Sequence, residues 1–434
     1  MTISHRGHSP KQRCILIVGS LFTLGALVFG STAHAQPPAE SAAIANVYTP
    51  PNPLPAGSPG DIIAGQPVRT AAVQADATLI SYHSVDALAA PMAVNATVFD
   101  PRPAWIGRGP RPLITFAVGT HGQGDQCAPS KLFTGLVHYS PPRDLMFEYE
   151  TAFIDLLIAR GIAVVVTDYQ GLGTPGTHTY FNRAAQAHAV LDAARAAQKL
   201  PGTSIPGHGP IGIWGYSQGG GAAAAAAEAA SSYAPDLDVR GSYIGAPIAD
   251  AAAVLSNIDG TIIAGAIGYY LNGAMAGHPR SRPVIEEMLN PAGKAMLETV
   301  HRQCLFETAV DFGYQSSRQW TTSGRSIPDL LAENPDTRTI LDADRVGYRT
   351  PNAPVLLATG DNDDIVPAGQ ARQLAATWCA RGASVDIVEI DVPPLFAGLG
   401  VGHNLIEYAA NLGWAQPLLD RIFNGAPIHD TCDG

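Results

Sequence analysis

The chain of 434 residues is longer than one small domain and fits a large α/β domain with an insertion. Its 46% apolar and 15% charged residues can form a sizeable core, which excludes an overall disordered chain. It holds 26 basic and 37 acidic residues, giving a net charge of −11, and it has no basic run. This composition excludes a nucleic-acid-binding surface.

The first 35 residues have the pattern of a secretory signal peptide. They begin with three basic residues, Arg6, Lys11 and Arg13. An uncharged, mostly apolar run follows over residues 15–30, and Ala-His-Ala at 33–35 supplies the small residues of a cleavage site. A membrane anchor is the alternative, but the apolar run is short for a bilayer span. We therefore expect a secreted, extracellular protein that begins at Gln36, with 23 basic and 37 acidic residues and a net charge of −14.

Four cysteines remain outside the signal segment: Cys127, Cys304, Cys379 and Cys432. An even number in an oxidising compartment predicts two disulfides, for which three pairings are open. Metal ligation is the weaker alternative, because no two cysteines have C-x-x-C spacing. We expect neither a metal nor a cofactor.

The mature chain begins with a Pro-rich arm over residues 36–76, whose prolines forbid regular helix and predict an extended strap. Beyond it, short apolar runs typical of strands come before and between longer helical patterns. We expect strands at residues 78–85, 93–99, 113–118, 162–167, 211–214, 239–244, 355–359 and 385–391. We expect helices at 145–160, 183–200, 219–233, 368–381 and 404–423. This order predicts an α/β fold, a mostly parallel sheet with helices on both faces.

Residues 251–350 interrupt the alternation, because they show helical patterns and loops but no clear strand. They divide the core into a first part, 77–250, and a second part, 351–434. An insertion after the sixth strand lies at the carboxyl edge of the strands, where open α/β sheets bind ligands. We therefore expect a helical cap or lid over an active site. A helical decoration that only enlarges the core is the alternative.

The sequence Gly215-Tyr216-Ser217-Gln218-Gly219 follows an apolar strand and opens an Ala-rich helix, which is the context of a nucleophile elbow. Such a turn holds the Ser217 hydroxyl above the sheet in a strained backbone conformation that requires close-packed neighbours without side chains. The amide of Gln218 would point at the oxyanion formed during attack. A structural Gly-Ser turn is the alternative.

A nucleophilic serine needs a histidine base, and the fold requires the order serine, acid, histidine. Of the histidines after Ser217, His278 and His301 lie in the expected cap and His429 lies in the C-terminal tail. His403 follows the last predicted strand and opens the last long helix. We therefore predict His403 as the base, with an ordinary loop histidine as the alternative.

The acid is expected in the loop after strand 355–359, which offers Asp361, Asp363 and Asp364. The spacing before Val366-Pro367 favours Asp363. Asp361 is then a turn residue and Asp364 a helix N-terminal acid. Asp361 is the alternative acid.

The second oxyanion donor is expected from the glycine-rich loop after the third strand, as the amide of a residue from Thr120 to Gln123. We interpret His121 as a residue that shapes this loop, because it precedes Ser217 and has no histidine nearby.

These motifs resemble those of the secretory lipase family of fungi and actinobacteria. The matching segments lie at residues 54–61, 124–130, 167–173, 215–220, 363–367 and 402–403. The resemblance implies an α/β-hydrolase fold with a helical cap, hydrolysis of lipid esters without a cofactor, and the disulfides Cys127–Cys304 and Cys379–Cys432. It also implies Gly122 as the second oxyanion residue, at a position where a yeast member has an acidic residue.

We therefore expect a serine lipase in which Ser217, His403 and Asp363 form a triad and an acyl-enzyme. The apolar run 262–275 is either the wall of an acyl-chain tunnel or a core helix. A carboxylesterase for short or polar esters and a secreted acyltransferase remain alternatives, and a serine peptidase or an inactive binding module is less favoured. The expected partners are a lipid or other ester and transiently a lipid surface, without an obligate protein partner.

Overall fold

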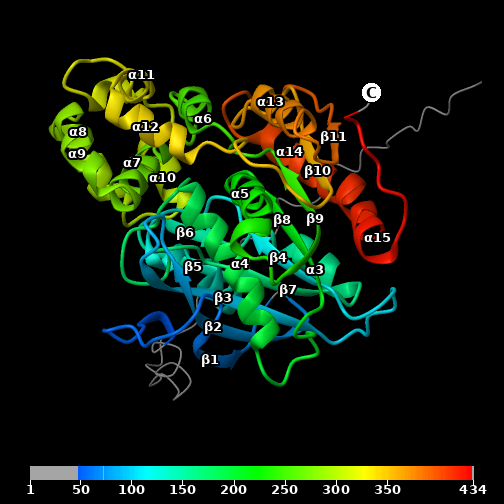
Figure 1. Cartoon of the computed structure of the whole chain (residues 1–434). Helices are drawn as coiled ribbons and strands as arrows, with labels where there is room; N and C mark the ends of the chain where they lie inside the picture. Colours follow the sequence, from blue (N-terminus) through cyan, green and yellow to red (C-terminus); the bar gives the residue numbers. More distant parts are fainter. Residues whose placement is uncertain (1–46, 72, 433–434) are drawn as a thin grey trace, which may run out of the picture.

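The computed structural model describes residues 47–71 and 73–432 (Figure 1). The predicted signal segment, residues 1–35, and the start of the Pro-rich arm lie outside the described residues. In the part that is described, no helix is long and apolar enough to cross a membrane.

The described residues form a central sheet of nine strands. In spatial order these are β1 (Ile62–Val68), β2 (Ala75–Val85), β3 (Pro91–Pro101), β7 (Ala163–Thr167), β4 (Leu113–Ala117), β8 (Pro210–Tyr216), β9 (Asp238–Gly245), β10 (Val355–Thr359) and β11 (Val385–Glu389). The pairs from β1 to β7 are antiparallel, and all pairs from β7 to β11 are parallel. The prediction of a mostly parallel sheet is therefore confirmed.

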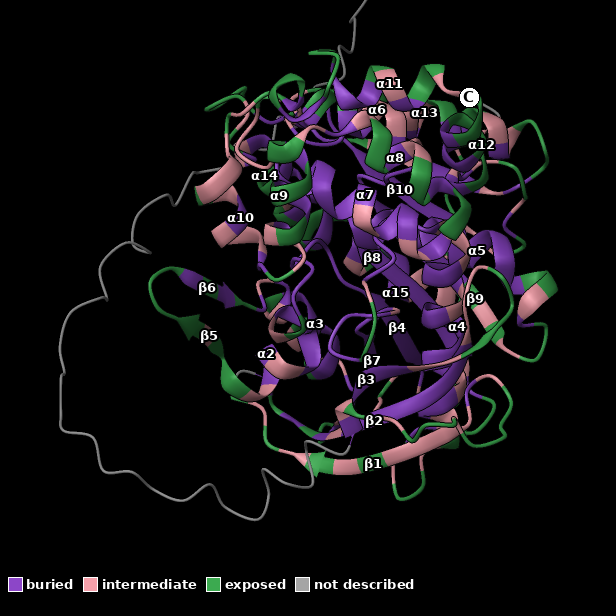
Figure 2. Ribbon diagram, turned by 90° about the vertical axis from the view of Figure 1, so that its left-hand side faces the viewer, coloured by how far each residue is buried: buried purple, intermediate pink, exposed green. Residues whose placement is uncertain are grey.

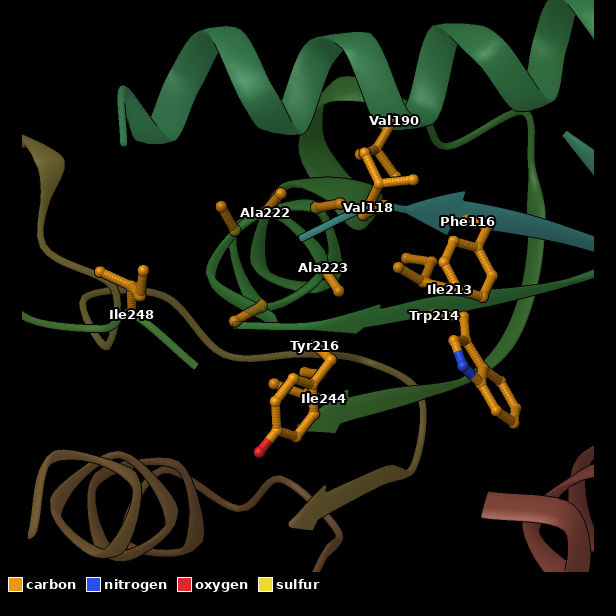
Figure 3. Packing of buried hydrophobic residues seen from close by; sticks show 14 of the residues in the cluster. Phe116, Val118, Val190, Ile213, Trp214, Tyr216, Ala222, Ala223, Ile244 and Ile248 are labelled. Carbon is orange, nitrogen blue, oxygen red and sulfur yellow. The ribbon is translucent and has the colours of Figure 1, made fainter. Parts of the chain in front are cut away.

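Helices cover both faces of this sheet (Figure 2). One face carries α4 (Arg183–Lys199), α5 (Gln218–Tyr233) and α13 (Ala368–Cys379), and the other carries α3 (Thr151–Ala159) and α15 (Gln416–Asn424). Helix α5 lies close to the sheet because its residues 222–227 are all alanine and all buried. Figure 3 shows Ala222 and Ala223 in the same buried cluster as Val118 and Ile213.

Between β9 and β10 the described chain is helical. It forms α6 (Ala251–Ile258), α7 (Ala266–Gly277), α8 (Arg282–Met288), α9 (Pro291–Val300), α10 (Leu305–Phe312), α11 (Ile327–Glu333) and α12 (Pro335–Asp344). Helices α7 to α12 lie together above one end of the sheet (Figure 1). Helix α7 is buried on nearly all sides, because its glycines let neighbours approach closely: Gly268 contacts Met296, and Gly273 contacts the backbone of Tyr180.

Three parts of the fold differ from the predicted elements. Strand β1 forms inside the predicted Pro-rich arm, where Pro67 is tolerated because β1 is an edge strand. A hairpin of β5 (Val137–Ser140) and β6 (Asp144–Phe147) precedes α3. Strand β6 takes the place of the first residues of the predicted helix 145–160, since the side chains of β6 alternate between buried and exposed. The last predicted helix is divided into α14 (Val401–Ala410), a π-helical turn (Asn411–Ala415) and α15.

Candidate active site

Ser217 lies between the end of β8 and the start of α5, with φ 59° and ψ −119°. This conformation is strained for a residue with a side chain. A Cβ atom at Gly215 would overlap the carbonyl of Gly219, and one at Gly219 would overlap the carbonyl of Ala117. The two glycines of the motif are therefore required by the closeness of α5 to β8 and β4.

Asp363 and His403 form a close pair. The Nδ1 atom of His403 lies 2.8 Å from Oδ2 and 2.9 Å from Oδ1 of Asp363. The carboxylate is oriented by the amides of Ile365 and Val366, which donate to Oδ1 at 3.0 and 2.8 Å. Because Nδ1 donates its proton to the carboxylate, Nε2 is the atom left to act as a base.

The pKa of His403 depends on burial and on nearby carboxylates. Burial disfavours the charged imidazolium, but Asp363, with smaller effects of Glu407 and Asp364, favours it, and together they raise the pKa of His403 above its ordinary value. The ring is therefore a stronger base than a free histidine, which suits proton abstraction from a serine hydroxyl.

Asp364 holds the backbone of the loop that carries His403. Its carboxylate accepts from the amides of Gly400 at 2.7 Å and His403 at 3.1 Å, at the start of α14. The hydroxyl of Tyr216, beside the nucleophile, donates to the carbonyl of His403 at 2.7 Å. The two contacts of Asp364 were not predicted from the sequence, because Asp364 was expected at the beginning of the helix at 368. Asp361 instead pairs with Arg372 at the surface.

Ser217 and His403 line the same cavity, which has a volume of about 490 Å³. In the described chain no hydrogen bond joins the two side chains, and such contacts are often loose before substrate binds. The cavity wall is mainly apolar and comes from the loop after β4, from residues before α3 and α4, from the end of β8, from residues 248–309 and from the C-terminal part of the core. Its apolar members are Phe147, Phe181, Ile248, Val254, Ile258, Ile262, Ile263, Leu305, Phe306, Ala309, Ile365 and Leu399.

The loop after β4 reaches the cavity at Gly119 and Thr120, but Gly122 does not line it. Gly122 instead forms a bridge with Cys304, beside hydrogen bonds from Gln123 N to Gln303 O and from Leu305 N to His121 O. Gly122 lies outside the cavity wall because this loop is attached to the start of α10. The position that the resemblance implies for the second oxyanion residue is therefore held against Cys304, outside the cavity wall.

Two disulfides are present in the described chain, Cys127–Cys304 and Cys379–Cys432, which is the pairing that the resemblance implies. The first joins the loop after β4 to the start of α10, and both of its cysteines are fully buried. The second ties the C-terminal segment to the end of α13. The other histidines that follow Ser217 do not line the cavity.

Comparison with known proteins places this geometry in a family. The sequence model of the secretory lipase family matches residues 138–430. A probable inactive lipase of Mycobacterium tuberculosis is 27% identical over 78% of this chain and 74% of its own length. A secreted triacylglycerol lipase of Malassezia furfur is 24% identical over 74% of this chain, which spans 63% of that relative.

The fold is also that of a solved structure. Candida antarctica lipase A superimposes with a TM-score of 0.73 and 20% identity, covering 89% of both chains. This likeness shows the fold, and the family match covers more than half of the sequence. The chain belongs to the secretory lipase family and is an ester hydrolase with the α/β-hydrolase fold.

Proposed function

We propose that the protein is a secreted lipase that cleaves lipid esters through the triad Ser217, His403 and Asp363. The observation that carries this proposal is the His403–Asp363 pair beside Ser217 in one apolar cavity. The name of the Mycobacterium tuberculosis relative describes that protein as inactive. In this chain all three triad side chains are present.

The reaction follows from the positions of these atoms. Ser217 Oγ attacks the ester carbonyl while His403 Nε2 takes the hydroxyl proton, and Asp363 stabilises the imidazolium. The tetrahedral intermediate collapses, the C–O bond to the alcohol breaks, and His403 protonates the departing alkoxide. Water, deprotonated by His403, then hydrolyses the acyl-enzyme and releases the fatty acid and Ser217.

The oxyanion needs two donors, and we assign them to the amides of Gln218 and Thr120. Gln218 is the first residue of α5, where amides have no partner within the helix. Thr120 lines the cavity, and its amide donates to no acceptor in the described chain. Thr120 falls within the expected range 120–123 and replaces Gly122 as our candidate.

The helical segment between β9 and β10 is proposed as the cap, because eight of its residues contribute to the cavity wall: Ile248, Val254, Ile258, Ile262, Ile263, Leu305, Phe306 and Ala309. Of the apolar run 262–275, only Ile262 and Ile263 line the cavity, and α7 is mainly a core helix. Burial of an acyl chain against these side chains supports binding by about 0.8 kcal/mol per CH₂ group.

The mouth of the cavity supports contact with a lipid surface. Phe147, Leu399 and Tyr408 line the cavity and are also exposed, and Phe396 and Leu405 are exposed beside them in the chain. Exposed apolar groups at the entrance of a site favour adsorption to a lipid-water interface. Secretion is proposed from the signal pattern of residues 1–35, and both disulfides fit an oxidising compartment.

The test is the initial rate of the secreted chain and of Ser217→Ala on p-nitrophenyl butyrate and p-nitrophenyl palmitate. We expect turnover of both esters by the parent and loss of both in Ser217→Ala. A parent that cleaves only butyrate would indicate the carboxylesterase. Net transfer to an added alcohol at the expense of hydrolysis would indicate the acyltransferase. Activity that survives in Ser217→Ala would overturn the triad.

A further inference from the structure

Three consecutive residues of the loop after β4 are each held by one of three consecutive residues before α3. The amide of Gly119 donates to Glu150 Oε2 at 2.7 Å. The hydroxyl of Tyr149 donates to the carbonyl of Thr120 at 3.0 Å.

His121 makes the third contact. Its Nε2 atom lies 2.8 Å from Glu148 Oε2, and its Nδ1 atom lies 3.0 Å from the carbonyl of Gly119. The contact with Glu148 is an ion pair when His121 is protonated. The Tyr149 ring stacks on the His121 ring with centroids 4.8 Å apart. Burial disfavours protonation of His121, but Glu148, the carbonyl of Gly119 and Asp168 together raise its pKa.

These contacts determine which groups of the loop are free to bind substrate. The amide of Gly119 is used by Glu150, and the carbonyls of Gly119, Thr120 and His121 all accept hydrogen bonds. The Thr120 side chain is paired with the Tyr180 hydroxyl at 2.7 Å. The Thr120 amide is thus left at the cavity wall without a partner in the described chain.

We propose that Glu148, Tyr149 and Glu150 are positioning residues that hold residues 119–121 so that the Thr120 amide points at the oxyanion. This proposal rests on the proposed function, because the oxyanion forms only if Ser217 attacks an ester. None of the three residues needs to touch the reacting atoms. They act through the backbone that they fix, as residues that support an oxyanion hole do.

The second part of the proposal concerns the protonation of two buried acids, Glu150 and Glu407. One oxygen of each, Oε1, has no hydrogen-bond partner among the described residues. Glu407 lies one turn after His403 on α14 and lines the cavity. Because a buried carboxylate oxygen without a partner disfavours the charged form, we assign a retained proton to this pair of acids.

The charges around the pair agree with this assignment. Burial raises the pKa of Glu150 well above its ordinary value, and the charges of Glu407 and Glu148 raise it further, against the effect of the Gly119 amide. Burial also raises the pKa of Glu407 to about 7, with His403 and His121 opposing and Glu148 adding to the rise. Both acids therefore lose their protons at a higher pH than exposed glutamates do.

Three buried tyrosines that face the pair, Tyr149, Tyr169 and Tyr243, have raised pKa values and stay neutral. The rings of His121 and His403 also face it, and the pKa of each is raised beside its carboxylate partner. Loss of the retained proton adds a negative charge beside the oxyanion loop, so the rate should fall as the pH rises.

The experiment compares Glu150→Ala, Glu150→Gln and the control Glu228→Gln in kcat, KM and pH profile on p-nitrophenyl butyrate. Glu228 is also a buried acid, but it binds Trp378 and the backbone at residues 347 and 349, away from the cavity. We expect Glu150→Ala to lower kcat by about 10- to 100-fold with little change in KM, because one oxyanion donor accounts for about 10²- to 10³-fold.

Glu150→Gln provides the rescue, because its amide oxygen still accepts from Gly119 and its side chain stays neutral at every pH of the assay. We expect kcat within about threefold of the parent and the alkaline limb moved up by about one pH unit or more. A limb unmoved in Glu150→Gln, or moved equally in Glu228→Gln, overturns the retained proton. A parent-like kcat in folded Glu150→Ala overturns the positioning role.

Hydrogen exchange separates this proposal from the proposed function. The amide of Gly119, which Glu150 binds, should exchange faster in Glu150→Ala than in the parent and should stay protected in Glu228→Gln. This result is expected even if the chain shows no Ser217-dependent activity, in which case the proposed function fails alone. Equal exchange in Glu150→Ala and the parent overturns the clamp whatever the activity is.

Discussion

The two disulfides close loops of different length and hold different parts of the molecule. Cys127 and Cys304 are 177 residues apart, and Cys379 and Cys432 are 53 apart. Loop-closure entropy at 25 °C gives about 5 kcal/mol for the first and about 4 kcal/mol for the second, as upper values. On stability alone, removing either bridge should therefore have a similar effect.

The effect on activity should differ, because only one bridge borders the cavity. Cys304 directly precedes Leu305, which lines the cavity, and Cys127 belongs to the loop that carries Thr120. The other bridge ends in a C-terminal segment that lies along β11, where Thr431 N donates to Val385 O. We expect the double variant Cys127→Ala/Cys304→Ala to lose stability and at least tenfold in kcat. The matched variant Cys379→Ala/Cys432→Ala should lose stability with kcat within about twofold.

Guanidinium unfolding measures the first quantity, and ester hydrolysis at a temperature where every variant is folded measures the second. A loss of less than about 1 kcal/mol in Cys127→Ala/Cys304→Ala would refute the closure argument, since that value is far below the entropic term. Equal kcat in the two double variants would show that the first bridge does not hold the oxyanion loop.

Three further predictions concern the triad, the core and the cavity. Asp363→Asn should lower kcat on p-nitrophenyl butyrate by roughly 10⁴-fold, because an amide no longer holds the His403 tautomer with Nε2 free; a loss below tenfold would count against Asp363. Burial raises the pKa of Asp168 to about 7, although Ser130 donates to its carboxylate. Its folded pKa thus exceeds its unfolded value, and the parent should lose on the order of 4 kcal/mol of unfolding free energy as pH rises from about 4 to 8. Urea unfolding of Asp168→Asn should show that part of the slope removed, and an unchanged slope would contradict the assignment. Ile263→Trp should reduce the rate on palmitate at least tenfold while sparing butyrate, and an equal effect on both esters would exclude this side chain from the acyl site.

The elements that depend on local pattern were predictable from the sequence. The eight expected strands all occur in the sheet, because strands buried in its middle give short apolar runs with clear ends, and six of the eight are parallel. The strained turn at Ser217 was also expected, since Gly215 and Gly219 leave space that no other residue can provide. His403 and Asp363 could be predicted because each follows a strand at the carboxyl edge of the sheet, where α/β folds place their ligand sites.

The parts that were missed depend on contacts between distant segments. Gly122 fits the motif position, but it forms a bridge with Cys304, 182 residues later, and does not line the cavity. Glu148 and Glu150 lie in a polar stretch between a hairpin and a helix, where acidic residues are usually solvated. Nothing in their spacing indicates that they are buried against residues 119–121, about 30 positions earlier.

The loop at residues 361–364 shows why residue type alone does not assign a role. Two adjacent carboxylates serve one histidine in different ways: Asp363 binds the His403 ring, and Asp364 binds the His403 amide. This requires the two loops to touch, and a Cβ at Gly402 would overlap the carbonyl of Asn362. Asp361, only two residues away, points outward to Arg372. The triad is therefore specified by the close approach of two backbones, which places one carboxylate at the ring and the next at the amide. Any substitution at Gly402 should accordingly disturb both contacts at once, although it changes no catalytic side chain.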